Sequence, residues 1–239
     1  MKKPLIGVTL DRQEKGDYSK RPHYAMRVHY FNTIEAAGGM PIALPLNQHL
    51  VAEYAGLIDG LISPGGGLQK PADWYVQEPV ADPFPASPRL AFDVALMQAM
   101  LALKKPLLGI CEGMQILSGL SGCKLTRNLP HHCKTVCDHL NEKPLEERAH
   151  RVTITPGSKL HTITGKSQFM VNSAHREGVL STPTGITVAA QADDGVIEAI
   201  ELENHPFALG VQWHPEMFPT PDTPDFALFQ AFITAAQKA

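Results

Sequence analysis

A cysteine between two glycines, in the run Gly109-Ile110-Cys111-Glu112-Gly113, has the setting that best suits chemistry. The apolar run at 106–110 predicts a strand that leads into the cysteine, and the stretch at 112–120 predicts a helix that follows it. Glycines let the backbone bend sharply at such a strand-to-helix turn, which exposes the side chain between them. The N–H groups at the start of a helix favour a thiolate over a thiol. Cys111 is therefore a candidate nucleophile, and a buried core cysteine is the alternative.

A histidine and a glutamate near the end of the sequence are candidates for the base that a thiol nucleophile needs. His214 and Glu216 follow an apolar run at 208–211 that predicts a strand. In an extended segment, side chains two residues apart point the same way, so Glu216 can orient His214. Pro215 restricts its own backbone and that of His214. Cys111, His214 and Glu216 then fill the roles of nucleophile, base and orienting acid, whereas a histidine that merely caps a strand end is the alternative.

Three consecutive glycines, at 65–67, directly follow a predicted strand at 60–63. Backbone N–H groups in such a run can approach a ligand without interference from a Cβ atom. We expect the N–H of Gly66 and that of Glu112, just after the nucleophile, to face a developing oxyanion. A plain flexible turn is the alternative. The glycines belong to a Pro- and Gly-rich stretch at 64–88, which predicts a long surface loop of the kind that often carries function.

The length and charge of the chain limit the classes of protein to which it can belong. A sequence of 239 residues with no linker suits one α/β domain over 1–239. The 24 acidic and 21 basic side chains give a formal net charge of −3 without a basic block, which argues against nucleic acid and favours a small-molecule substrate. The apolar run near the start is too short for a signal or membrane segment, so we expect a cytoplasmic protein without membrane contact. Four cysteines do not form a disulfide scaffold in a chain of this length.

The order of the predicted elements indicates an α/β fold with a mostly parallel sheet covered on both faces. Runs with strand character and runs with helical character alternate through the first half, and Gly38-Gly39 mark a helix end. The later part is rich in strands, with a turn at Asp193-Asp194-Gly195 between two of them. A closing amphipathic helix is predicted at 225–238, with Phe226, Phe229, Phe232 and Ile233 on one face. The other expected strands are 5–9, 40–44, 107–110, 152–154, 169–171, 186–192 and 196–202, and the other expected helices are 24–37, 51–57, 89–103 and 112–120.

With these residues assembled, the chain resembles class I glutamine amidotransferase-like proteins, and within them the gamma-glutamyl-gamma-aminobutyrate hydrolase (peptidase C26) family. The resemblance extends over nearly the whole chain, and its last block is long and specific. Its anchors are Gly7-Val8, the runs at 37–41, 59–61 and 65–67, the cysteine run at 109–115, and the blocks at 171–175 and 204–216.

This resemblance implies a flavodoxin-like three-layer sandwich with an added strand-rich C-terminal part. It also implies that Cys111 attacks a γ-glutamyl amide to give a thioester. His214 would protonate the leaving amine and later activate the water, and Glu216 would hold His214 in place. Gly65, Gln115 and the segment Ser173-Ala174-His175 match positions that contact the glutamyl group. Ordinary turn packing is the alternative for that segment. No cofactor and no metal is implied, and a second copy of the chain is a candidate partner.

Two positions depart from the family pattern. The residue after the nucleophile is usually arginine in this family, and here it is Glu112. A carboxylate pointing inward would raise the pKa of Cys111, so we expect the Glu112 side chain to point outward. An aspartate commonly follows the glycine run, and here Leu68 takes its place. The identity of the amine attached to glutamate is therefore the open question.

Histidines and cysteines also gather at 131–139, in the run His-His-Cys-Lys-Thr-Val-Cys-Asp-His. These residue types suit zinc, but zinc sites usually show two separated ligand pairs, and the sequence shows no second pair at the usual spacing. A solvent-facing loop or short helix is the alternative. Cys123, beside Gly122, is expected to be a small buried hydrophobic residue.

Three functions fit these observations. The first is a free-standing hydrolase of γ-glutamyl-aminobutyrate or γ-glutamyl-polyamine compounds. The second is a glutaminase subunit that delivers ammonia to a synthase partner. The third is a binding or regulatory protein that kept the fold without catalysis, and an intact set of Cys111, His214 and Glu216 argues against it.

Overall fold

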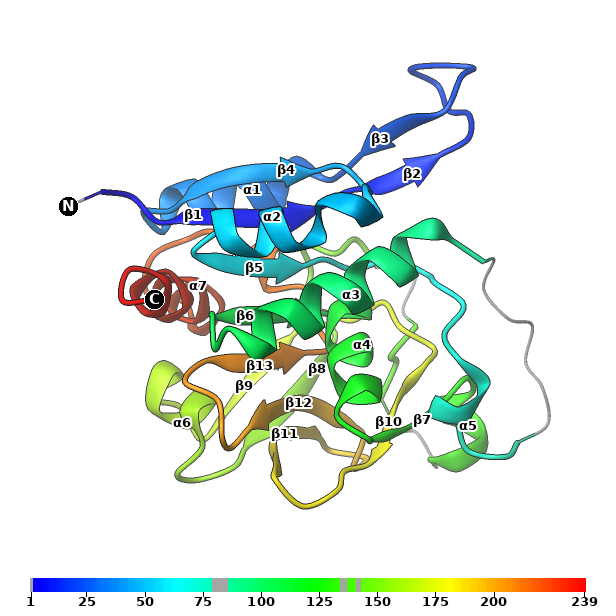
Figure 1. Ribbon diagram of the computed structural model, residues 1–239. Coiled ribbons are helices and arrows are strands. Elements are labelled where there is room, and N and C mark those ends of the chain that lie inside the picture. The colour runs from blue at the N-terminus through cyan, green and yellow to red at the C-terminus, as the bar shows by residue number, and fades with distance from the viewer. Residues whose placement is uncertain (1, 79–85, 134–136, 141–142) are drawn as a thin grey trace.

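A computed structural model describes residues 2–78, 86–133, 137–140 and 143–239. Its centre is a parallel group of strands in the order β4-β1-β5-β6-β13, which follow one another from top to bottom in Figure 1. Their bounds are Leu5–Thr9 (β1), Met40–Leu44 (β4), Gly60–Ser63 (β5), Leu107–Ile110 (β6) and Ala208–Val211 (β13). These are the five ranges that the apolar runs predict. Each central strand is apolar on both faces because helices cover both.

Two buried clusters mark the two faces of the parallel strands. Side chains of β6 alternate between them, with Leu107 in one cluster and Leu108 in the other. One face is covered by Val28–Ala36 (α1) and Pro224–Ala236 (α7), and Lys159–Thr164 (α6) packs on α7. The opposite face is covered by Val51–Leu57 (α2), Pro88–Ala102 (α3) and Glu112–Leu120 (α4). The result is the three-layer α/β arrangement that the sequence predicts (Figure 1).

The sheet continues beyond β13 with antiparallel strands, in the order β12-β11-β8-β9. Gly195, at φ 86°, closes the turn between β11 and β12, as expected at 193–195. Strand β10 pairs with β12 and with β7, so this part is wider than the sequence indicates. The bounds are Lys124–Thr126 (β7), His150–Ile154 (β8), Gln168–Val171 (β9), Gly178–Ser181 (β10), Ile186–Ala192 (β11) and Ile197–Leu202 (β12).

The predicted helix at 24–37 begins later than expected, because its first residues belong to a hairpin. Asp11–Gln13 (β2) and His23–Ala25 (β3) form a separate hairpin, which projects from the body at the upper right of Figure 1. Pairing with β2 holds Tyr24 in a strand, and α1 begins only at Val28. The remaining short helices are Gln48–Leu50 (η1), Ala72–Trp74 (η2), Leu129–His132 (α5) and Pro215–Met217 (η3).

The stretch at 64–88 is not simply a surface loop. Leu68, Lys70 and Tyr75 are buried, and Tyr75 pairs with Leu125 of β7. Residues 79–85 of this stretch lie outside the described ranges. Its described part passes over the end of the parallel strands and joins them to the antiparallel part.

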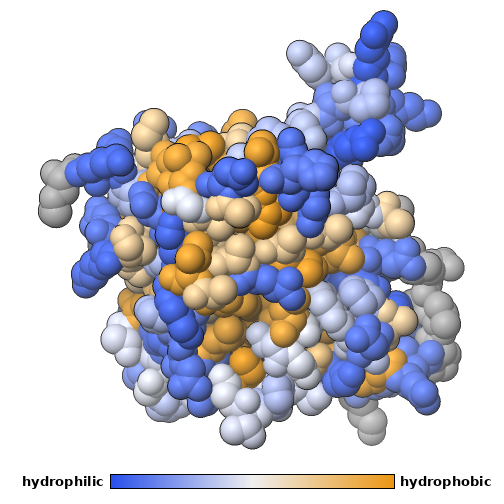
Figure 2. Space-filling model, viewed as in Figure 1, coloured by the Kyte–Doolittle hydropathy of each residue, from blue (hydrophilic) through white to orange (hydrophobic). Residues whose placement is uncertain are grey.

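Apolar side chains also gather on the surface over the face that carries α2 and α3, whereas the β2–β3 hairpin is strongly polar (Figure 2). Exposed large apolar side chains of the described residues include Met40, Leu57 and Leu103. Among the described residues, no helix combines the length and apolar character needed to cross a membrane.

Candidate active site

Cys111 lies at the sharp turn between β6 and α4, with φ 52° and ψ −103°. This is a backbone conformation that residues other than glycine rarely adopt. The glycines on either side are needed for close approach: a Cβ on Gly109 would lie 2.6 Å from the carbonyl carbon of Gly113, and one on Gly113 would collide with the carbonyl of Ser63. The turn therefore presents the cysteine at the carboxyl end of the parallel strands, where α/β folds place their reactive groups.

His214 and Glu216 come together at the end of β13, the strand beside β6. Nδ1 of His214 lies 2.8 Å from Oε1 of Glu216, and both side chains are buried. The local backbone differs from the expected extended segment, because Pro215–Met217 forms a 3-10 turn. That turn still directs the carboxylate back to the ring. Nε2 is thus the ring nitrogen left to face the thiol.

Asn172, which directly follows β9, fixes the backbone of His214. Its Oδ1 accepts a hydrogen bond from the His214 N–H at 2.8 Å, and its Nδ2 donates to the His214 carbonyl at 3.1 Å. Thr33 of α1 similarly donates to the carbonyl of Glu216 at 3.1 Å. Sequence reasoning missed both roles, although Asn172 stands inside the block at 171–175.

The charges of this group favour an ionised pair. Burial alone would lower the pKa of His214, but the Glu216 carboxylate and the Cys111 thiolate, each also hydrogen-bonded to the ring, raise the pKa to about 10. Burial would raise the pKa of Glu216, yet the charge and hydrogen bond of His214 and the charge of Arg27 hold it below its usual value. Nη2 of Arg27 lies 3.9 Å from Oε1 of Glu216. His214 is therefore an imidazolium paired with the Glu216 carboxylate at neutral pH.

The glycine run is held by a buried arginine from α3. Arg89 donates to the carbonyls of Pro64 at 2.6 Å and Gly65 at 2.8 Å, and its Nε lies 3.1 Å from Asp93. In a trans peptide the N–H points opposite to the carbonyl, so the N–H of Gly66 points away from Arg89. Gly66 lies in the wall of the cavity that contains Cys111.

Gly65 lies against the imidazole of His214. A Cβ there would lie 2.7 Å from Cε1 of His214, so glycine makes room for the imidazole. Its N–H donates to the hydroxyl of Tyr30 at 2.9 Å. It lines the neighbouring cavity beside Arg27, and Gly66 is shared by both cavities.

The cavity at Cys111 has a volume of about 360 Å³, which suits a small molecule. Nε2 of Gln115 donates to the carbonyl of Glu177 and to Oε1 of Gln212, both at 3.1 Å, so its amide is anchored at the cavity wall. The lining residues are Gly66, Cys111, Glu112, Gln115, Leu140, Ala174, His175, Arg176 and Glu177.

The expectation that Glu112 points outward is wrong. Its side chain is buried, its Oε1 lies 2.7 Å from Nζ of Lys70, and its Oε2 accepts a hydrogen bond from the Leu68 N–H at 3.3 Å. Lys70 also lies 2.9 Å from Glu177, whose carboxylate accepts a hydrogen bond from Tyr75 at 2.7 Å. Burial would lower the pKa of Lys70, but the two carboxylates raise it, so the ammonium stays charged and compensates Glu112. The sequence could not show the pairing of Glu112 with Lys70, because the two residues lie in segments far apart in the chain.

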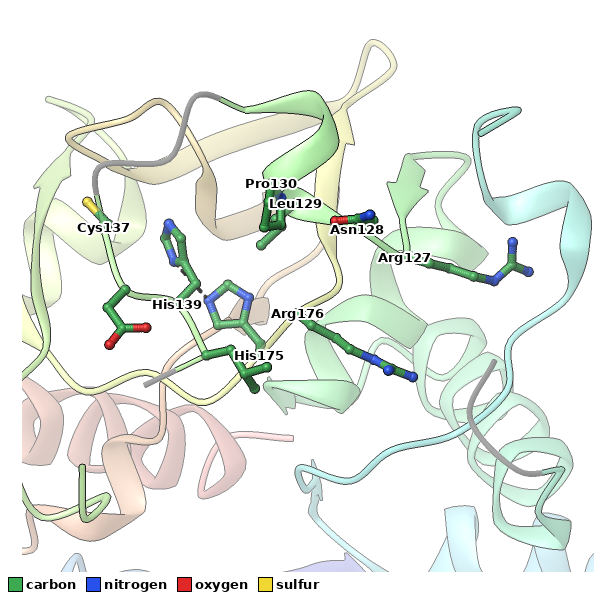
Figure 3. Close-up of a pocket in the computed structure, with 10 residues that line it drawn as sticks. Arg127, Asn128, Leu129, Pro130, Cys137, His139, His175 and Arg176 are labelled. Carbon is green, nitrogen blue, oxygen red and sulfur yellow. Dashed lines mark hydrogen bonds between the residues drawn. The ribbon is translucent and has the colours of Figure 1, made fainter. Parts of the chain in front are cut away.

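The segment at 173–175 divides between two environments. Ala174 and His175 line the cavity, whereas the Ser173 hydroxyl is buried and donates to the carbonyl of His139 at 2.8 Å. Nε2 of His175 lies 3.4 Å from Glu198, in a buried cluster behind the wall. A second cavity, also of about 360 Å³, shares Leu140, His175 and Arg176 with the first and includes Arg127 (Figure 3).

The remaining cysteines are free thiols outside this site. Cys123 is buried, as expected of a small core residue, and burial raises its pKa to about 11. Cys133 and Cys137 are half-buried, and residues 134–136 between them lie outside the described ranges.

Comparison with known proteins shows the family of this chain. The sequence profile of the Peptidase C26 family matches residues 4–216. The chain belongs to that family. A gamma-glutamyl-gamma-aminobutyrate hydrolase of Escherichia coli K12 is 34% identical over 252 residues, which covers 99% of this chain and 95% of the relative. A glutamine amidotransferase-like protein of Rickettsia prowazekii is 31% identical over 277 residues and covers 98% of each chain.

Solved structures show the same fold at lower identity. The glutaminase domain of Trypanosoma brucei CTPS, with bound acivicin, matches with a TM-score of 0.69 and 17% identity, over 98% of this chain and 94% of that one. The class I glutamine amidotransferase-like α/β fold is thereby confirmed. The family and its hydrolase members support hydrolase activity or an amidotransferase-like role for this chain.

Proposed function

We propose that this protein is a thiol hydrolase that cleaves the γ-glutamyl amide bond of a small γ-glutamyl compound. The observation that carries the proposal is the group formed by Cys111, His214 and Glu216 at the ends of β6 and β13. There Cys111 stands at a strained turn in a cavity, and His214 is bound to Glu216 at 2.8 Å. Such a group supplies a nucleophile, a proton carrier and an orienting acid.

In the first half-reaction the Cys111 thiolate attacks the amide carbon, and the carbonyl electron pair moves to oxygen. The N–H groups of Gly66 and Glu112 face this oxyanion. That of Glu112 stands in the first turn of α4, where N–H groups have no partner within the helix. The imidazolium of His214 then gives its Nε2 proton to the departing nitrogen as the C–N bond breaks. An amine leaves, and the γ-glutamyl group stays bound to Cys111 as a thioester.

In the second half-reaction His214, now neutral, takes a proton from water as the water oxygen attacks the thioester carbon. The C–S bond breaks, glutamate is released, and the thiolate and imidazolium are restored. Glu216 keeps Nδ1 protonated throughout, so that Nε2 is the nitrogen that exchanges protons. Gln115, Ala174 and His175 would contact the glutamyl part of the substrate from the cavity wall.

The second cavity favours one class of leaving amine. Arg127 and Arg176 lie in its wall against one carboxylate, that of Asp138. Its charge is therefore better suited to an amine that carries a carboxylate, as aminobutyrate does, than to a polycation. We expect kcat/KM to be higher for γ-glutamyl-aminobutyrate than for a γ-glutamyl-polyamine. In Arg127→Gln the ratio of these two kcat/KM values should be smaller than in the wild type.

The deciding experiment is hydrolysis of γ-glutamyl-aminobutyrate by purified protein, with Cys111→Ala beside the wild type. We expect the variant to lose about 10⁵-fold to 10⁶-fold in kcat with an unchanged Tm, because the nucleophile acts as a unit with its base. A catalytically silent binding protein would give no turnover and no adduct at Cys111 with a glutamine-like electrophile. Full activity in Cys111→Ala would refute the assignment of the nucleophile.

A glutaminase subunit is the second candidate, supported by the likeness to the Rickettsia protein and to a glutaminase domain. It would use the same thioester chemistry on glutamine and pass ammonia to a synthase. Turnover of glutamine that is negligible alone and rises sharply with a synthase partner would favour it. Unaided turnover of γ-glutamyl-aminobutyrate, with glutamine a poor substrate, would favour the hydrolase.

A further inference from the structure

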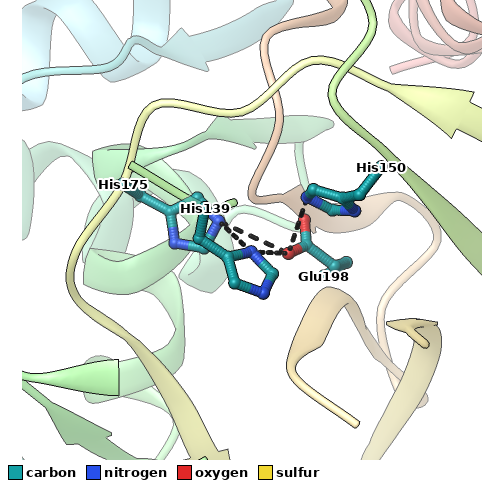
Figure 4. A group of neighbouring side chains, drawn as sticks. All are labelled: His139, His150, His175 and Glu198. Carbon is teal, nitrogen blue, oxygen red and sulfur yellow. Dashed lines mark hydrogen bonds and ion pairs between the residues drawn. The ribbon is translucent and has the colours of Figure 1, made fainter. Parts of the chain in front are cut away.

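Four buried side chains meet behind the cavity wall: His139, His150, His175 and Glu198 (Figure 4). Each comes from a different segment. His139 stands in the loop before β8, His150 begins β8, His175 follows β9, and Glu198 lies on β12. Each is at most 5% exposed. The mechanism above uses none of their titratable atoms.

The facing atoms of the four residues all lie within 4.8 Å of one another. Oε1 of Glu198 lies 3.3 Å from Nδ1 of His139, 3.4 Å from Nε2 of His175 and 3.7 Å from Nε2 of His150. Nδ1 of His139 and Nε2 of His175 are 3.3 Å apart. Four ligands at about 2.0–2.1 Å from a tetrahedral zinc ion are separated by roughly 3.3–3.4 Å. The distances among Glu198, His139 and His175 match that separation, and His150 would move inward to complete the set.

The opposite ring nitrogen of every histidine faces an acceptor. Nε2 of His139 lies 3.0 Å from Oδ2 of Asp194, and Nδ1 of His175 lies 3.0 Å from the carbonyl of Glu177. Nδ1 of His150 lies 3.3 Å from the carbonyl of Arg151. Acceptors at these positions place the protons on the outer nitrogens and turn the lone pairs inward, as in histidines that bind metals.

Inward lone pairs beside a carboxylate leave a concentration of negative potential that a cation would relieve. Nε2 of His150 and Oε2 of Glu198 have no hydrogen-bond partner among the described groups, although both are buried. Buried polar atoms without a partner are costly and require an explanation, of which a bound ion is one. Two positive charges would be balanced by Glu198 and, through His139, by Asp194.

We propose that His139, His150, His175 and Glu198 bind one zinc ion. Three imidazole nitrogens and one carboxylate oxygen suit zinc rather than magnesium or calcium, which prefer oxygen ligands. Four protein ligands in a buried cluster make a closed, structural site with no position for a reacting water. The proposal departs from the expectation of a metal-free protein. Only His139 comes from the run at 131–139, and its partners come from strands and turns far along the chain.

The ion would join the cavity wall to the antiparallel part of the sheet. His175 stands between Ala174 and Arg176 in that wall, and Asn172 of the same segment holds the backbone of His214. Fixing His139 and His175 to β8 and β12 would thus fix both the substrate cavity and the histidine beside Cys111. Metal loss should raise KM and lower Tm.

The test is the metal content of the purified protein, with zinc supplied during expression and no chelator. We expect about one zinc per chain in the wild type, in Cys111→Ser and in His131→Gln, a control that removes an exposed histidine nearby. His150→Gln and Glu198→Gln should lose it. Asp194→Asn, which keeps all four ligands, should bind zinc about 10–100-fold more weakly.

Two measurements on the wild type test the proposal without depending on whether the variants fold. Cobalt(II) bound in place of zinc should give the strong visible absorption of a tetrahedral site, without a thiolate charge-transfer band. Zinc returned to chelator-treated protein should raise Tm. The proposal would be overturned if the wild-type protein took up neither zinc nor cobalt. It would also be overturned if Glu198→Gln and His150→Gln contained as much zinc as the wild type.

Discussion

The parallel and antiparallel parts of the sheet build function in different ways. In the parallel part, Cys111 and His214 stand at the ends of adjacent strands, and short local motifs around each determine its geometry. In the antiparallel part, His139, His150, His175 and Glu198 meet only through long-range packing. Local motifs can thus be recognised in a sequence, whereas a site assembled from distant segments cannot. The two parts meet at the cavity wall, so perturbing one contact at a time should separate their contributions.

Glu216→Gln tests the parallel part at the residue that orients His214. The amide keeps the size of the side chain but removes the charge that raises the pKa of His214 to about 10. Since a raised pKa keeps the imidazolium present below that value, the alkaline fall in wild-type kcat/KM should come as pH rises through about 10, and in the variant it should begin at lower pH. We expect kcat to drop about 10³-fold to 10⁴-fold, as when a triad carboxylate is neutralised. A pH profile that does not move would contradict the role of Glu216.

Lys70→Met tests the link between the parts, because Lys70 follows β5 and contacts both Glu112 of α4 and Glu177 near β10. Removing the buried ammonium leaves two buried carboxylates without their cation. We expect a loss of about 3–5 kcal/mol in the free energy of unfolding, measured with denaturant. Lys166→Met, at an exposed lysine, is the matched control and should change stability little.

The same variant should make stability depend on pH. Burial and the neighbouring Glu177 carboxylate raise the pKa of Glu112 and Lys70 opposes them, so without Lys70 the pKa of Glu112 in the folded state lies further above its value in the unfolded state. The folded state then binds more protons, so stability falls as pH rises through the acidic range and is partly restored on acidification. Adding Glu112→Gln and Glu177→Gln to Lys70→Met should abolish this dependence. A loss of stability that is equal at pH 5 and pH 8 would show that packing, rather than charge, explains it.

The same contrast between local motifs and distant contacts explains which features could be predicted from the sequence. The bounds of β1, β4, β5, β6, β13 and α4 agree with prediction because each is a largely apolar run or, for α4, a helix that begins directly after the glycine-flanked cysteine. The contact of His214 with Glu216 was accessible because the two residues are neighbours. Glu112 was misjudged because its partner, Lys70, lies in a stretch without periodicity. Strand pairing likewise overrides local preference at Tyr24, and β7 and β10 are too short to give a periodic signal.

The smallest predicted effect compares one substitution in the two parts. Gly165 ends α6 at φ 61°, and Gly56 lies within α2; a Cβ would meet nothing within 4 Å at either position. Because space is available at both, only the backbone should decide the outcome. Gly165→Ala should lose about 1 kcal/mol, since the left-handed conformation penalises a side chain. Gly56→Ala should gain about 0.4–1 kcal/mol by restricting the unfolded chain. Both should leave kcat/KM unchanged. Denaturation midpoints that move in the same direction would contradict the backbone argument, whereas opposite shifts with constant activity would show that stability and the site at Cys111 can be altered separately.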